Sequence, residues 1–181
     1  QSQSEEFTSQ VDHLEDIFTE ATDVFTLLTS LENFLKMSHK YEGSDFCIFL
    51  KSDWTSVFVN SEENLPQNLE YGSQVQSVIS IMNNEKYLRE MINTRDLIPS
   101  KMKSERPSTY LFMPIYNHSY VHGYFVAKNS FTLIKDRFGY TWTRKFGSSI
   151  ELFRKRNMYK QMSQQFLRLS TNDALSGLLN R

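Results

Sequence analysis

Apolar residues near the start of the chain recur at alternating intervals of four and three residues. Such steps are typical of the a and d positions of a heptad, so they predict one helix over residues 5–38. A second row at Ile17, Val24 and Leu31 widens the apolar face. This width favours a helix packed on its own domain and on a partner chain over one packed on its domain alone. The principal row is Phe7, Val11, Leu14, Phe18, Ala21, Phe25 and Leu28.

The following part of the chain alternates apolar runs with polar breaks. Gly43 is expected to end the first helix. The run DFCIFLK at 45–51 predicts a buried strand, and TSVFVN at 55–60 predicts its hairpin partner. Residues 73–94 predict a helix, because their apolar residues fall on one side of a helical projection. These residues are Val75, Val78, Ile79, Met82, Leu88 and Met91.

Two polar segments, 61–72 and 95–108, contain prolines and predict loops, the second of them as a lid. The stretch 109–129 is rich in β-formers around a polar turn at 117–119, and it predicts a hairpin. From about residue 131 to 170 the chain is expected to be helical again. The element order predicts an α+β fold, an antiparallel sheet flanked by long N- and C-terminal helices.

The last predicted helix changes its apolar face along its length. At about 100° per residue, the second stripe is rotated by roughly 140° from the first. We therefore expect 138–153 to pack on the sheet and 154–170 to form a parallel two-stranded coiled coil; the alternative is one helix bent around its own domain. The first stripe is Trp142, Phe146, Ile150 and Phe153, and the second is Met158, Met162, Phe166 and Leu169.

These two helical regions predict a homodimer. Residues 1–40 are interpreted as a dimerisation helix that is part of the domain, and 154–170 as a signalling helix. The expected interface residues are Phe7, Val11, Leu14, Phe18, Phe25, Met158, Met162, Phe166 and Leu169.

Strand alternation divides the predicted hairpin into two faces. One face is expected to form a dry core with the terminal helices, and it carries Leu111, Met113, Ile115, Val121, Phe125 and Ala127. The other is aromatic with polar tips, which suits the wall of a small-molecule pocket, although it could equally fill a second core. It carries Tyr110, Phe112, Tyr116, Tyr120, His122 and Tyr124.

Composition narrows the function classes. The net charge is −1, which does not favour nucleic-acid or membrane binding, and the longest apolar runs are too short to span a bilayer. A single cysteine, Cys47, lies inside an apolar run and fits a buried residue in a reducing, cytoplasmic setting. His118 and His122 flank a turn without nearby Cys, Asp or Glu, so a metal site is not expected. No catalytic constellation is apparent in the sequence, and no cofactor is expected.

The hairpin FMPIYNHSYVHGYFVAKNSF resembles the end of a GAF domain, where a proline in one strand, a polar turn and a glycine in the next strand precede a closing helix. Here these are Pro114, Asn117–Ser119 and Gly123, and the element order agrees over roughly 10–160. PAS domains share much of this layout. The resemblance implies a sensory domain over 41–153, with a ligand site on the sheet face away from the terminal helices and a cover formed by 73–108. Because Gly123 lacks a side chain, the closing helix is expected to lie close to the strand there. The implied ligand-binding residues are Tyr87, Arg95, Tyr110, Phe112, His122 and Tyr124.

The final residues DALSGLLNR resemble the entry motif of GGDEF domains, Asp-x-Leu-Thr-Gly-Leu-x-Asn-Arg. The resemblance implies that 171–181 are the truncated start of a diguanylate cyclase domain, which would need Mg²⁺ and GTP to make cyclic di-GMP. This chain would then be the non-catalytic sensory part of a longer protein, unless the parent domain is degenerate and only binds. The matching residues are Asp173, Leu175, Gly177, Leu178, Asn180 and Arg181, with Ser176 in place of Thr.

Overall fold

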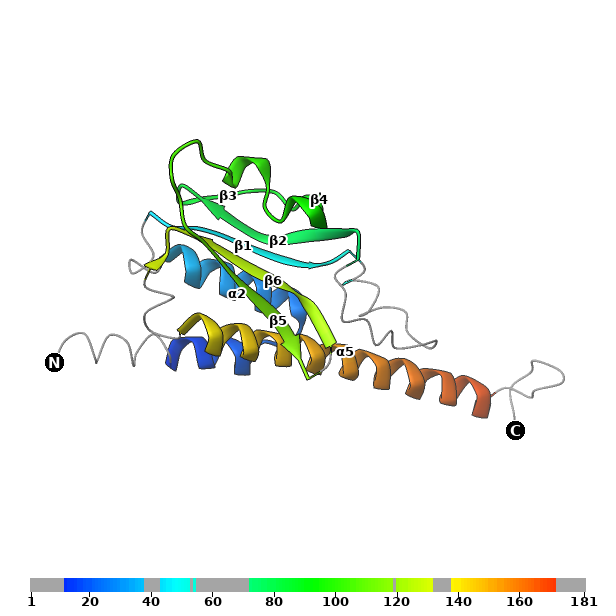
Figure 1. Ribbon diagram of the computed structural model, residues 1–181. Coiled ribbons are helices and arrows are strands. Elements are labelled where there is room, and N and C mark those ends of the chain that lie inside the picture. Colours follow the sequence, from blue (N-terminus) through cyan, green and yellow to red (C-terminus); the bar gives the residue numbers. More distant parts are fainter. Residues whose placement is uncertain are drawn as a thin grey trace.

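Six antiparallel strands form the central sheet of this α+β fold (Figure 1). The computed structural model describes residues 12–37, 43–52, 54, 72–118, 120–131 and 138–171. The strand order is β3-β2-β1-β6-β5, and β4 also pairs with β2. The strands are β1 (Asp45–Lys51), β2 (Gln74–Met82), β3 (Glu85–Lys86), β4 (Met91–Asn93), β5 (Tyr110–Asn117) and β6 (Tyr120–Lys128).

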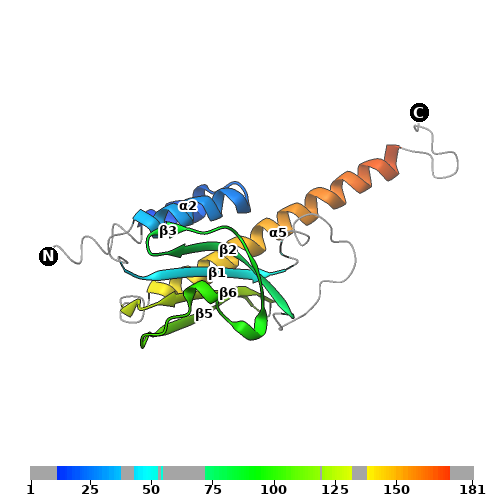
Figure 2. The ribbon, with the colours of Figure 1, turned by 90° about the horizontal axis from the view of Figure 1, so that it is seen from above.

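The helices lie together on one face of the sheet, and the segment between β4 and β5 covers the other (Figures 1 and 2). On the helical side are the helical residues 12–20, α2 (Val24–Met37) and the first half of α5 (Phe138–Thr171). The covering segment contains two 3₁₀ turns, Thr94–Asp96 and Ser100–Met102.

The expectation of one continuous N-terminal helix is wrong, because the chain leaves the helix at 21–23 and starts again at Val24. Asp23 caps the new helix: its carboxylate accepts the Thr26 backbone N–H at 2.9 Å and the Thr26 hydroxyl at 3.0 Å. The hydrogen bonds from Thr26 lower the pKa of Asp23. The apolar rows still face the core on both sides of the break, since Leu14 and Leu28 are buried.

The helix expected at 73–94 is also wrong, because this segment forms β2, β3 and β4. Asn83 and Asn84 both have positive φ, 51° and 66°, which is the geometry of a two-residue turn that joins twisted strands. β2 has apolar residues on both faces because both are covered, and a continuous apolar run also contains the i, i+3 and i+4 spacings of a helix.

The strand at 45–51 and the hairpin at 109–129 are confirmed as β1 and as β5 with β6. β1 pairs with β2 on one side and β6 on the other. The strand predicted at 55–60 and the loop at 61–71 lie outside the described residues.

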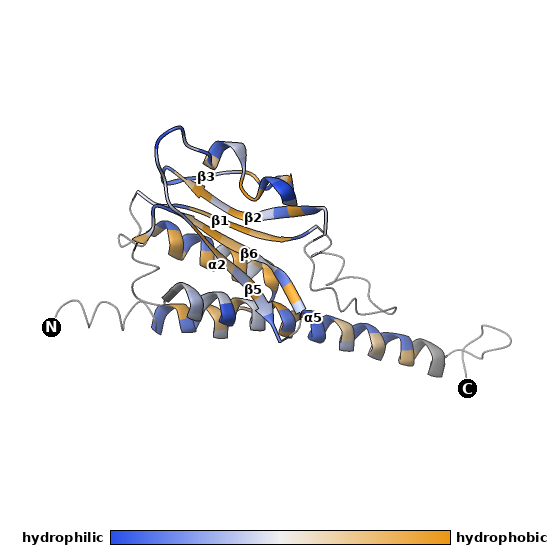
Figure 3. Cartoon of the chain, in the orientation of Figure 1, coloured by the Kyte–Doolittle hydropathy of each residue, from blue (hydrophilic) through white to orange (hydrophobic). Residues whose placement is uncertain are grey.

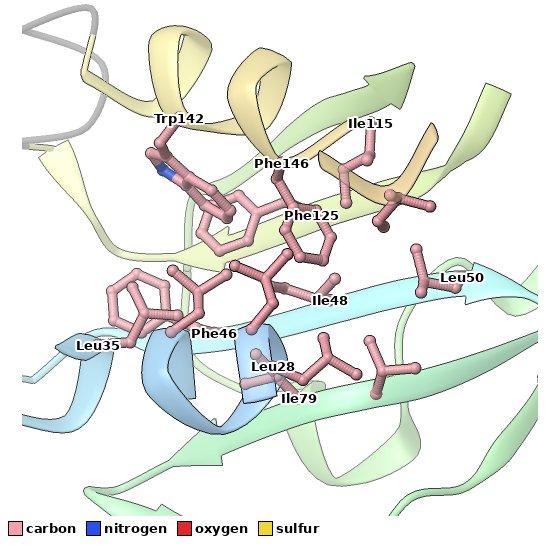
Figure 4. Close-up of a cluster of buried hydrophobic side chains, with 14 of the residues drawn as sticks. Leu28, Leu35, Phe46, Ile48, Leu50, Ile79, Ile115, Phe125, Trp142 and Phe146 are labelled. Carbon is pink, nitrogen blue, oxygen red and sulfur yellow. The ribbon is translucent and has the colours of Figure 1, made fainter. Parts of the chain in front are cut away.

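The main core lies between the sheet and the helices (Figure 4). Phe125 of β6 forms an edge contact with Trp142 of α5, with ring centroids 4.6 Å apart, and stacks near Phe46 of β1 at 5.8 Å. Leu28 and Leu35 of α2 close the same cluster. This confirms the predicted dry face of the hairpin at Leu111, Met113, Ile115, Phe125 and Ala127.

α5 changes environment along its length. Trp142, Phe146, Ile150 and Phe153 are buried, which confirms the expected packing of the first half on the sheet. Beyond this point the helix extends past the sheet (Figure 1), and hydrophobic and hydrophilic residues alternate along it (Figure 3). Tyr159, Met162, Phe166 and Leu167 are between 53% and 72% exposed. None of the described helices has an apolar stretch long enough to cross a membrane.

Close backbone contact between the helix and the sheet occurs at Gly147, not at Gly123 as expected. A Cβ on Gly147 would lie 2.3 Å from the carbonyl oxygen of Tyr116 on β5. A Cβ on Gly123 would lie 1.9 Å from the carbonyl oxygen of Phe49 on the neighbouring strand. Gly123 therefore permits the close pairing of β6 with β1, whereas Gly147 permits the close approach of α5 to β5.

Candidate functional site

Aromatic residues gather on the sheet face away from the helices, where a ligand site was expected. Phe49, Tyr124 and Val126 form a second apolar cluster there with Met102 of the covering segment. The rings of Phe49 and Tyr124 are 5.0 Å apart. Met102 is fully buried and lies against the sheet from above. Residues 94–109 therefore cover this face, which agrees with the expected lid at 95–108. The rest of the expected cover, 73–94, is wrong, because this segment forms strands of the sheet.

The tyrosine hydroxyls of this face hold the cover in place. The Tyr124 hydroxyl donates to the Leu97 carbonyl oxygen at 3.0 Å, and the Tyr110 hydroxyl donates to that of Met102 at 2.9 Å. Leu97 has a φ of 61°, and the Ile98 N–H bonds back to the Asp96 carbonyl at 2.7 Å, which is a tight three-residue turn. A leucine is strained in this conformation, so the cover stores strain at the residue that Tyr124 holds.

The structure brings four of the six predicted ligand-binding residues to this face. Tyr124 lies in the cluster, and Tyr110 and Tyr87 pack against it. Lys101 Nζ is 5.1 Å from the ring centroid of Tyr87. Phe112 is 42% exposed, and its ring lies 6.3 Å from that of Tyr124. Arg95 is on the cover and exposed, and its backbone N–H donates to the Asn93 side chain at 2.9 Å.

His122 does not join these residues, so its expected place on the aromatic face is wrong. A bulge separates the pairs Ile115–Gly123 and Tyr116–Val121, which leaves His122 as an extra residue in β6. A bulge reverses the alternation of side chains beyond it. His122 and Tyr120 consequently point toward α5, and Tyr116 also places its hydroxyl 3.4 Å from that of Tyr140 on this helix.

At the start of β6, a group of polar side chains is buried against α5. We call Lys51, Tyr120, His122, Glu151 and Arg154 the exit cluster. The Glu151 carboxylate accepts two bonds from Arg154, at 2.8 Å from Nε and 2.5 Å from Nη2. His122 Nε2 lies 3.8 Å from a Glu151 oxygen. Lys51, His122, Glu151 and Arg154 are each at most 9% exposed.

Burial controls protonation in the exit cluster. It lowers the pKa of His122 to about 4, against the attraction of Glu151, so the imidazole is neutral at pH 7. Burial alone would raise the pKa of Glu151, but the hydrogen bonds and charge of Arg154 outweigh it and lower this pKa. The cluster at neutral pH therefore combines an ionised carboxylate and a guanidinium with an uncharged imidazole. The sequence showed this region only as a basic run, and its carboxylate was missed.

An open groove that the sequence did not indicate runs between residues 12–20 and the first half of α5. Thr19, Arg144, Ser148 and Ser149 contribute polar groups to it. Lys145 also lines the groove and forms an ion pair with Glu15 across it, so one of its two cations is already neutralised.

Reactive chemistry finds little support in the part of the chain that the structure describes. Cys47 is fully buried and burial raises its pKa to about 12, so it is not a nucleophile at neutral pH. Among the described residues no three His, Cys, Asp or Glu side chains are placed to hold a metal ion. No family model, curated protein or solved structure matches this chain.

Proposed function

We propose that this chain is a sensory and dimerisation module that regulates a C-terminal GGDEF diguanylate cyclase domain in a longer parent protein. The observation that carries the proposal is the course of α5. One helix of 34 residues begins on the sheet and continues beyond it to Thr171. The GGDEF-like residues 173–181 follow directly in the sequence. A rigid connection of this kind passes a change in the domain to whatever follows the helix.

We assign the fold to the GAF-like class, with a PAS-like domain as the alternative. The assignment is supported by the central pairing of β1 with β6, by N- and C-terminal helices on one sheet face, and by a separate cover over the other. The cover is built from 3₁₀ turns and extended chain rather than a long helix, so this part departs from the expected layout.

The proposed sensory input is a small molecule of unidentified structure that binds under the cover. The aromatic walls at Tyr87, Tyr110, Phe112 and Tyr124 support this, as does the strained turn at Leu97. A ligand would have to displace Met102 and take over the tyrosine hydroxyl bonds.

A passive dimerisation scaffold is the second candidate. It is favoured by the full burial of Met102 and by the two tyrosine hydroxyls, which already have acceptors in the cover.

The deciding experiment is to read the coding sequence beyond Arg181 and assay the full-length protein with GTP and Mg²⁺. We expect an intact signature loop and formation of cyclic di-GMP by a dimer. A following domain of another class would contradict the proposal. A GGDEF domain that binds GTP without converting it would instead support control of a degenerate domain.

A second assay separates sensor from scaffold. Tyr124→Phe removes one bond to the cover and keeps the aromatic ring, so a sensor should change its basal cyclase rate severalfold. A passive scaffold should keep its rate. Tyr159→Phe, which alters an exposed hydroxyl on α5, is the matched control.

A further inference from the structure

The exit cluster marks the point where α5 leaves the sheet. Arg154 is 5% exposed, whereas the next two residues, Lys155 and Arg156, are exposed. The cluster draws its members from three elements: Lys51 ends β1, Tyr120 and His122 begin β6, and Glu151 and Arg154 belong to α5. Arg154 is the last fully buried side chain of α5 among the residues that the structure describes.

Tyr120 receives cations from two directions. Lys51 Nζ lies 4.8 Å from the centroid of its ring, and the Arg154 guanidinium carbon lies 5.6 Å from it. His122 packs beside the same ring at 4.8 Å and faces Glu151. In this contact β6 contributes an aromatic ring and an imidazole, and α5 contributes a guanidinium and a carboxylate. Cation–π contacts of this kind gain strength when they are removed from water.

These contacts can form together in only one rotational orientation of α5 about its own axis. Successive residues of an α-helix are separated by about 100°. A rotation of α5 by one residue would take Arg154 away from Tyr120 and bring Phe153 or Lys155 toward the ring and imidazole. Buried ionic groups add little net stability compared with apolar residues, but removing one partner leaves an unpaired charge and is costly. Such groups can therefore select one packing arrangement without strengthening it.

We propose that the exit cluster sets the rotational orientation of α5 as it leaves the domain. The regulatory role of the cluster rests on the proposed function. In that role, the exit cluster transmits a change in β6 to the second half of the helix. Tyr124 and His122 belong to the same strand, so a change at the cover has a short path to the joint.

A distance measurement on the whole chain tests this proposal without a cyclase. Spin labels on Glu85→Cys in β3 and Gln164→Cys in α5 report how the helix is directed, since both positions are exposed. Cys47 is buried and does not compete for the label. Dilution with unlabelled chain isolates distances within one chain. The test variant, Glu151→Leu with Arg154→Met, removes both members of the hydrogen-bonded pair at once, so neither of the two is left without the other.

We expect one narrow distance in the native chain and in Arg156→Met, the control that removes a neighbouring exposed charge. The double variant should keep the midpoint of urea unfolding but show a broadened or shifted distance, by up to about 8 Å for a one-residue rotation. Tyr120→Leu, which leaves all charges in place, should broaden the distance as well. This second variant decides the question if the double variant fails to fold.

An unchanged narrow distance in both variants would overturn the proposal. In the parent protein the double variant should also change the cyclase rate while Arg156→Met does not. A parent without cyclase activity would contradict the proposed function, whereas the distance measurement would still decide the role of the exit cluster.

Discussion

The two halves of α5 have the same backbone conformation but different surroundings. In the first half, Trp142, Phe146 and Ile150 are at most 2% exposed and pack on the sheet. In the second half, Met162 and Phe166 are 53% and 72% exposed. Helices gain most of their stability from packing rather than from intrinsic propensity. The comparison indicates that the first half is held by its own domain, whereas the exposed second half depends on its continuity with the first.

The largest contrast is expected from shortening a phenylalanine in each half. Phe146→Ala should lower the free energy of unfolding by about 3–5 kcal/mol, because it opens a cavity in the main core. Phe166→Ala should change it by less than about 0.5 kcal/mol at a concentration where the chain is monomeric. Urea unfolding of both variants measures the difference. Equal losses would show that the second half is also packed on its own domain.

Gly147→Ala tests the same difference between the two halves of α5, here through the close backbone contact of the first half with the sheet. The added Cβ would meet the Tyr116 carbonyl oxygen at 2.3 Å, so the helix must move away from β5. We expect a loss of roughly 1–3 kcal/mol, as for an overpacked core, although alanine is the better helix former by about 1 kcal/mol. Ser163→Ala in the exposed half is the control and should be neutral or slightly stabilising in thermal unfolding.

Lowering the pH should destabilise the fold through His122, which lies where the two halves of α5 meet. His122 is neutral in the folded chain with a pKa of about 4, while an unfolded histidine has a pKa near 6.5. The unfolded state therefore binds more protons between these values, so stability falls as the pH falls from about 6.5 toward 4. Between pH 7 and pH 5 this contributes a loss of about 2 kcal/mol. Urea unfolding of His122→Leu at both pH values should show a correspondingly smaller loss, and an equal loss in both proteins would assign the effect to other groups.

The smallest effect is expected in self-association. The native chain should be a dimer by light scattering at tens of micromolar protein. Phe166→Glu or Met162→Glu should weaken association at least about tenfold, equal to roughly 1.4 kcal/mol, because two carboxylates would meet in a narrow seam. Gln164→Glu adds the same charge on the opposite side of the helix and should have little effect. A native monomer would contradict the dimer prediction.

Several features of the fold were predictable because their patterns are local. The continuous apolar run of β1, the hairpin of β5 and β6, and the stripe from Trp142 to Phe153 were all predicted correctly. The break at 21–23 was missed although Asp23 is a good capping residue, because the heptad spacing continues across it. β2 was mistaken for a helix because its burial on both faces removed the strict alternation of a strand.

The candidate site depended more on tertiary structure. Tyr110 and Tyr124 were correctly placed on one face by strand alternation. The insertion of Met102 beneath the cover has no signature in the local sequence. The bulge at His122 also has none, and it separates this residue from Tyr124 even though only one residue lies between them. The pairing of Glu151 with Arg154 follows their i, i+3 spacing, but their burial depends on how α5 crosses the sheet.

Because α5 is long, a small change in its direction at the exit cluster displaces its C-terminal end by a large distance. From Arg154 to Thr171 the helix extends about 25 Å at 1.5 Å per residue. A tilt of about 10° at the exit cluster would displace the tip by roughly 4 Å, about three quarters of the rise of one helical turn. A small change in tilt at the exit cluster therefore gives a large displacement at the end of the helix. In the dimer that we propose, a shift too small to alter the main core would be enough to bring the domains that follow the two helices into or out of register.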